Sequence, residues 1–157
     1  MSRPTINSIL VIQKAAEQLL PKINEWGEDS FRLDDLLKIL KDSFSDNGYQ
    51  LAKDFEDLGC EPDLELVEIL DSVIFIKLQC QKELIKEWVI NNNISSTKKE
   101  GDIVTIKHNR KNITGEIVRV DSELAQYLVC CQSEGHVKTG LGKQGFVINC
   151  EDIIEPL

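Results

Sequence analysis

Several patterns that would assign this chain to a special class of protein are missing. Proline and glycine are not enriched, with 4 and 9 among 157 residues, and 41% of the residues are hydrophobic, so wholesale disorder is not expected. Asp71 and Lys77 interrupt the longest apolar stretch, which therefore falls short of the roughly 18 residues of a membrane span. The amino terminus, MSRPTINSIL, has no secretory pattern. We therefore expect a folded protein that does not enter a membrane.

Paired cysteine motifs are also missing. The five cysteines are Cys60, Cys80, Cys130, Cys131 and Cys150. Because none forms a CxxC pair, they indicate neither a zinc ribbon nor a redox motif, and we interpret them as reduced thiols that pack as small apolar side chains. The alternative is a metal site built from Cys130 or Cys131 with Cys150 and His136. Reduced thiols without a leader predict a cytoplasmic protein, for which we expect no metal and no other cofactor.

The sequence contains no complete catalytic motif. The segment from Gly140 to Gly145 has formal GxGxxG spacing, but it leads into an expected strand rather than a helix, so it fails as a dinucleotide fingerprint. It also fails as a phosphate-binding loop, because Gln144 follows Gly142-Lys143. The chain has no GxSxG motif, and neither histidine has an evident partner. We therefore expect a protein that is not an enzyme.

Charge is unevenly distributed along the chain. Residues 1–93 hold 18 acidic residues against 10 Lys and Arg, a charge of −8, whereas residues 94–157 hold 9 against 8, a charge of −1. An acidic first part repels nucleic acids and anionic membranes at long range. Only the second part, with its KHNRK cluster at residues 107–111, is suited to meet a polyanion.

The first part has helical periodicity throughout. Apolar residues recur at helical spacing in residues 5–25, 30–43, a short segment that ends at Gly59, and Asp63–Ile90. Pro21 is expected to kink the first helix or to make it restart. Four helices joined by short loops predict a compact bundle.

Two residues do not fit the longest predicted helix, Asp63–Ile90. Phe75 falls in its polar strip and Lys77 in its apolar arc. A kink near Ser72 would shift the phase of the helix, or Lys77 would extend its charged head to water along an apolar stem. The alternative is that Phe75 is an interface residue that meets the second part or another subunit.

The second part alternates between apolar and polar residues, as strands do. The expected strands are Asp102–His108, Ile113–Asp121, Leu124–Gln132, Gln144–Cys150 and Ile153–Glu155. The polar segment ISSTKKE, residues 94–100, separates the two periodicities. We therefore predict a segregated α+β protein, with a helical bundle over residues 1–93, a linker over 94–100 and a small β-barrel over 101–157.

The second part resembles a known kind of barrel. Gly101-Asp102 opens an alternating strand, Gly115 precedes the sequence IVRVD at residues 117–121, and Glu151-Asp152-Ile153 closes the pattern. These features resemble a small SH3-like barrel of the KOW or Tudor type. The resemblance implies a module that binds a peptide, a modified side chain, RNA or another protein. The aromatic cage of Tudor domains that read methyl-lysine is not evident, because Tyr127 and Phe146 are the only aromatic residues here.

Two segments of the barrel are the candidate binding residues. The first barrel turn supplies cationic side chains, and the glycine-rich loop before the fourth strand supplies cations together with close backbone approach. The candidates are Lys107, His108, Arg110, Lys111, Lys138, Gly140, Gly142 and Lys143.

These observations support three functional hypotheses. The leading one is a non-catalytic binding, adaptor or regulatory protein whose barrel docks a protein partner. One alternative is a nucleic-acid-associated regulator that uses the basic first turn, and another is a small enzyme with a site between bundle and barrel. We expect no membrane partner, and self-association through the bundle is a further hypothesis.

Overall fold

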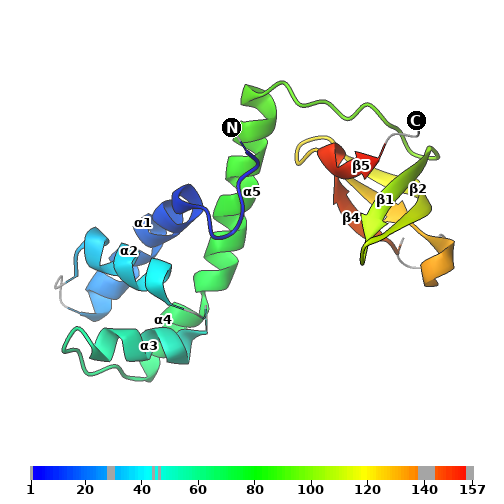
Figure 1. Ribbon diagram of the computed structural model, residues 1–157. Coiled ribbons are helices and arrows are strands. Elements are labelled where there is room, and N and C mark those ends of the chain that lie inside the picture. The colour runs from blue at the N-terminus through cyan, green and yellow to red at the C-terminus, as the bar shows by residue number, and fades with distance from the viewer. Residues whose placement is uncertain (1, 28–30, 44, 46, 138–143, 155–157) are drawn as a thin grey trace. The chain divides into compact units, whose positions relative to one another are not determined.

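The protein consists of a helical unit and a sheet unit. The computed structural model describes residues 2–27, 31–43, 45, 47–137 and 144–154. The chain divides into two compact units, Met1–Ile85 and Lys86–Leu157, each with its own apolar core. The segregated α+β class is confirmed (Figure 1), whereas the domain limits at residues 93 and 101 stay a prediction.

Five helices are found among the described residues of the first part. They are α1 (Ile9–Trp26), α2 (Leu33–Asp42), α3 (Gly48–Glu56), α4 (Leu64–Asp71) and α5 (Val73–Asn91), whose last turns fall in the second unit. Leu19, Leu36 and Phe55 are among the fully buried side chains that join α1 to α3 in the main core. A second cluster joins Val11 of α1 to Cys80 of α5. Burial of these apolar side chains is the main stabilising term.

The first helix continues through Pro21 and ends at Trp26, so the predicted restart at Pro21 does not occur. Leu19 and Ile23, on either side of the proline, are both fully buried. Their packing holds the chain in one helix despite the backbone hydrogen bond that proline cannot make.

The predicted single helix Asp63–Ile90 is wrong, because Ser72 separates α4 from α5. The Ser72 hydroxyl donates to the carbonyl oxygen of Ile69 at 2.6 Å, and the Ser72 N–H donates to the same oxygen at 3.2 Å. In a continuous helix that oxygen would accept from the N–H of Val73. The expectation of a phase change near Ser72 is therefore confirmed.

The two residues that did not fit the long helix both lie in the first turns of α5. Lys77 is only 2% exposed, so its predicted extension to water is wrong. Phe75 is 72% exposed, and its predicted role as an interface residue stays a prediction.

The carboxylate of Asp63, the residue directly before α4, fixes where this helix begins. Asp63 Oδ1 accepts from the Leu66 N–H at 3.0 Å and from the indole N–H of Trp26 at 3.0 Å. The bond from Leu66, followed by that from Trp26, holds the pKa of the Asp63 carboxyl below its usual value. The same carboxylate therefore caps α4 and ties it to the end of α1.

The second part forms one curled antiparallel sheet in the order β4-β3-β2-β1-β5. The strands are β1 (Ile103–His108), β2 (Lys111–Asp121), β3 (Gln126–Cys130), β4 (Phe146–Asn149) and β5 (Ile153–Ile154). Val104, Ile106, Ile117 and Val129 are buried on its concave side. A bulge between Ile117 and Arg119 interrupts the pairing of β2 with β3 and bends β2.

Gly115 allows the sheet to curl at the middle of β2. A Cβ at this position would lie 2.6 Å from Cys131 Sγ and 2.6 Å from Val129 Cγ1. Both distances are too short for carbon next to those atoms, so a larger residue would push the third strand outward.

No helix among the residues that the structure describes is long and apolar enough to cross a membrane.

Candidate functional site

The first barrel turn, between β1 and β2, presents cations on a well-defined backbone. Asn109 and Arg110 have φ values of 47° and 65°, and His108 pairs with Lys111 across the hairpin. Two successive residues with positive φ make a two-residue hairpin connection whose twist matches that of the strands. Lys107, Arg110 and Lys111 are all exposed, and residues 107–112 contain no acidic residue.

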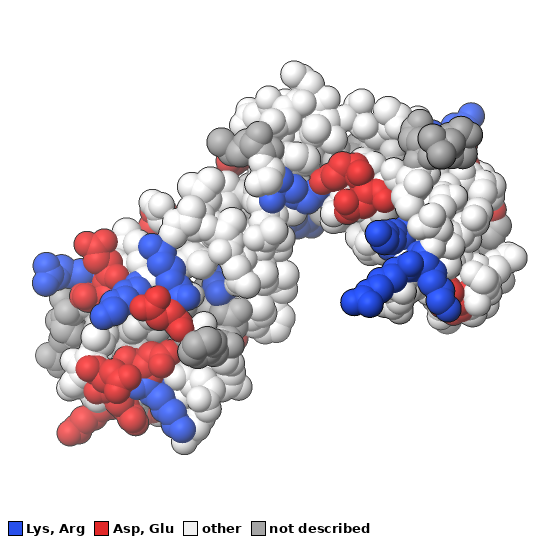
Figure 2. Space-filling view, viewed as in Figure 1, with Lys and Arg blue, Asp and Glu red and all other residues white. Residues whose placement is uncertain are grey.

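Figure 2 shows Lys and Arg gathered on one part of the sheet unit, whereas Asp and Glu are prominent on the helical unit. The first barrel turn therefore offers a local positive field in a protein of net charge −9.

An aromatic cluster lies beside this turn. The imidazole of His108 stacks on the ring of Phe146, with ring centroids 4.2 Å apart and an interplanar angle of 28°. His136 meets the same ring edge-on, at 4.6 Å and 71°. All three side chains are half-buried. We call His108, Phe146 and His136 the His-Phe-His cluster.

Hydrogen bonds orient both histidines of this cluster. Nδ1 of His136 accepts from the Cys131 N–H at 3.2 Å, which leaves the proton of a neutral ring on Nε2. Nε2 of His108 lies 3.0 Å from the side-chain nitrogen of Asn109, a residue of the turn itself. The cluster is thus joined to the first barrel turn on one side and to the end of β3 on the other.

The curl of the sheet creates the cluster. His108 ends β1 and Phe146 begins β4, two strands that are not neighbours in the sheet order. Their rings touch because the sheet bends until these strands approach each other. The sequence indicated no catalytic partner for either histidine, and the structure places both rings against Phe146. The predicted barrel was the signal that could have found this cluster, because a closed barrel brings the first and fourth strands close together.

The structure places the candidate residues unequally. Lys107, His108, Arg110 and Lys111 share the first barrel turn. Lys138, Gly140, Gly142 and Lys143 lie outside the described residues. The chain on either side of them is described, and the Gln144 N–H donates to the carbonyl oxygen of Val137 at 3.3 Å.

The alternative metal site at the cysteines is not formed by the described residues, which contain no group of three or more His, Cys, Asp or Glu side chains placed to hold a metal. Cys131 is fully buried, and burial raises the pKa of its thiol. A protonated, inaccessible thiol fits the interpretation of Cys131 as a small apolar side chain.

Tyr127 is directed to the linker rather than to the first barrel turn. Its ring is buried, and its hydroxyl oxygen accepts from the Lys98 N–H at 3.1 Å. Burial is the main cause that raises the pKa of this phenol. Tyr127 therefore anchors the entry to the sheet and leaves Phe146 as the aromatic residue of the candidate site.

Comparison of the chain with protein families, curated proteins and solved structures gave no match.

Proposed function

We propose that the sheet unit is an SH3-like barrel of the KOW or Tudor type and that it docks a protein partner without catalysing a reaction. The observation that supports this most directly is the first barrel turn lying beside the His-Phe-His cluster. Cations at the edge of a half-buried aromatic group are typical of protein-binding surfaces, where aromatic anchors supply affinity and peripheral charges supply selectivity and association rate.

The positive charge of the first barrel turn indicates which charge the partner carries. Lys107, Arg110 and Lys111 lie within five residues of one another with no acidic residue between them. A partner segment that carries Asp or Glu is attracted to this surface, and a basic one is repelled. We place this interaction in the cytoplasm, because all five cysteines are free thiols.

A pull-down from native cell extract tests the proposal. The variant with Lys107, Arg110 and Lys111 all changed to alanine should recover much less partner than the wild type, because it removes the positive edge of the surface. The matched control changes Lys98, Lys99 and Arg119 to alanine. It removes the same charge near the opposite end of β1, where Ile103 pairs with Glu116, and should recover the partner normally. Equal recovery by both variants would contradict the assignment to the first barrel turn.

A nucleic acid is the second candidate partner, because three cations in a short turn also suit phosphate groups. The salt dependence separates the two. Binding to RNA or DNA falls steeply between about 50 and 200 mM salt, since each neutralised phosphate releases counterions. Filter binding or fluorescence anisotropy at low salt checks this directly, and an absence of binding there removes this candidate.

A further inference from the structure

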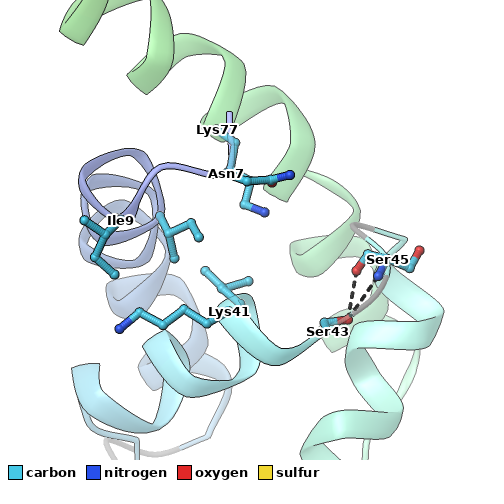
Figure 3. Close-up of a pocket in the computed structure, with 8 residues that line it drawn as sticks. Asn7, Ile9, Lys41, Ser43, Ser45 and Lys77 are labelled. Carbon is cyan, nitrogen blue, oxygen red and sulfur yellow. Dashed lines mark hydrogen bonds between the residues drawn. The ribbon is translucent and has the colours of Figure 1, made fainter. Parts of the chain in front are cut away.

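The helical unit contains a pocket that is separate from the surface proposed above. Its volume is about 380 Å³, which lies within the range of small-molecule sites, roughly 300 to 1,000 Å³. Three elements surround it: the start of α1 with the segment before it, the end of α2 with the segment after it, and α5 (Figure 3). The lining residues are Asn7, Ile9, Ile12, Leu40, Lys41, Ser43, Ser45 and Lys77.

Lys77 is the unusual member of this lining. It is 2% exposed, and it is the buried charged residue among the core residues that the structure describes. Figure 3 shows its side chain extending from α5 toward the segment that carries Asn7. Lys77 is not a free cation, because it already takes part in an interaction. The position of Lys77 matters because removing an ammonium group from water is costly. Here this buried ammonium group lines a pocket.

The pocket has one polar and one apolar side. Asn7, Ser45 and Lys77 bring hydrogen-bond donors. The Ser45 hydroxyl oxygen accepts from the Asn47 N–H at 3.1 Å, so its proton can be donated to a ligand. Ile12 and Leu40 are buried apolar residues of the same lining. Ile9, which is exposed, is a third apolar residue of this lining.

The charge of the lining selects among ligands. Its described residues include two lysines, Lys41 and Lys77, and no carboxylate. A cationic ligand would meet like charge at short distance, and a neutral one would leave the ammonium of Lys77 without added stabilisation. An anion gains from the ammonium of Lys77 in a lining whose described residues carry no negative charge, and a short hydrocarbon chain gains from the apolar side.

From these observations we propose that the pocket binds a small aliphatic carboxylate. The carboxylate group lies against Lys77, with Asn7 and Ser45 as further donors, and the hydrocarbon chain lies along Ile9, Ile12 and Leu40. This site is independent of the first barrel turn, so either can fail without the other.

An NMR titration of the full chain with hexanoate tests the site. Hexanoate should cause saturable shifts of the backbone amides of Asn7, Ser43 and Ser45. Hexylamine, which has the same chain with the opposite charge, should cause none at these amides. Equal shifts with hexylamine or hexanol would overturn the role of the carboxylate. Equal shifts with inorganic phosphate would overturn the role of the hydrocarbon chain, and the absence of saturable shifts with hexanoate would overturn the site.

A pair of variants tests the role of Lys77. Lys77→Met keeps an unbranched side chain of similar length and removes the charge, so hexanoate should bind about tenfold more weakly or worse, as expected for loss of a charge-assisted hydrogen bond. The matched control is Lys82→Met, an exposed residue of the same helix, which should bind as the wild type does. Affinity of Lys77→Met within twofold of wild type would overturn the proposal. If Lys77→Met loses its dispersed spectrum, the double variant Asn7→Ala and Ser45→Ala gives the same decision through the other donors.

Discussion

At the scale of single residues, one buried polar atom can hold two parts of the fold together. Tyr127 illustrates the point. The phenol lies in the core of the sheet, and its hydroxyl oxygen accepts from the backbone of Lys98 at 3.1 Å. One side chain therefore packs the core and holds the segment that enters the first strand.

Tyr127→Phe should lower the free energy of unfolding of the sheet unit by about 0.5 to 1.5 kcal/mol, because the Lys98 N–H loses its acceptor while the ring stays in place. Urea unfolding followed by resolved amide signals of β1 to β3 measures this. Tyr49→Phe is the control, since Tyr49 is 57% exposed, and it should leave stability unchanged. A loss of equal size in both variants would contradict the role given to the Tyr127 hydroxyl.

The same pair of proteins should differ at high pH. Burial raises the pKa of Tyr127, so the folded state keeps the phenol protonated after the unfolded chain, with a pKa near 10, has begun to ionise. The stability that Tyr127 contributes is complete below about pH 10 and is lost as the pH rises through its folded-state pKa. The wild type should therefore lose more stability above pH 10 than Tyr127→Phe does.

The candidate site shows where residue-level prediction from sequence stops. Lys107, Arg110 and Lys111 were found because they are consecutive or nearly so, and the hairpin keeps them together. The contact of His108 with Phe146 joins residues 38 positions apart in sequence. Such contacts depend on the curvature of the sheet, which comes from the bulge in β2 and from Gly115, and no local periodicity records it.

At the scale of helices and strands, periodicity located the helical stretches and all five strands found in the described residues, but it merged α4 and α5 into one helix. The misfit of Phe75 and Lys77 indicated a kink near Ser72 as one alternative, but the full end of one helix there could not be predicted, because the bond from the Ser72 hydroxyl to the Ile69 oxygen leaves no mark in the hydrophobic pattern. The first residues of α3 show another feature that hydrophobic periodicity does not record. Asn47 caps α3, with its side chain accepting from the Gln50 N–H at 3.2 Å.

Gly48 sets the distance between α3 and α4. Its N–H donates to Asp71 Oδ1 at 2.8 Å, and a Cβ on it would lie 2.5 Å from the carbonyl oxygen of Val67. Because that neighbour is backbone, Gly48→Ala should destabilise the helical unit by about 1 to 3 kcal/mol, the usual cost of overpacking.

Thermal or urea unfolding followed by circular dichroism at 222 nm measures this loss. Gln50→Ala, at an exposed position of the same helix, should change stability by less than about 0.5 kcal/mol. Wild-type stability in Gly48→Ala would show that α3 and α4 can separate freely.

At the scale of the whole molecule, the two units differ in electrostatic character. Met1–Ile85 holds 9 Lys and Arg against 17 acidic residues, a charge of −8, and Lys86–Leu157 holds 9 against 10, a charge of −1. Composition alone gave this contrast, and the fold preserves it because nearly all charged side chains are on the surface of their own unit. The identity of the partner has no such signature, since a charged surface selects a class of ligands rather than one molecule.

Salt should therefore stabilise the two units unequally. Raising the NaCl concentration from about 20 to about 300 mM shortens the screening length from roughly 20 Å to below 10 Å and weakens repulsion among the acidic groups. We expect the unfolding midpoint of the helical unit to rise and that of the sheet unit to change less. Amide signals assigned to each unit, followed through a thermal series at both salt concentrations, separate the two midpoints, and an equal rise in both would contradict this explanation.

The capping arrangement at α3 also bears on how the protein ages. Asparagine followed by glycine is the sequence most prone to spontaneous deamidation, in which the glycine nitrogen attacks the asparagine side-chain carbonyl to close a succinimide ring. Here both reacting groups are engaged, since the Gly48 N–H donates to the Asp71 carboxylate and the side-chain oxygen of Asn47 accepts from the Gln50 N–H. The folded helical unit therefore protects Asn47 from deamidation. The rate of deamidation at this position then reports how often the start of α3 opens.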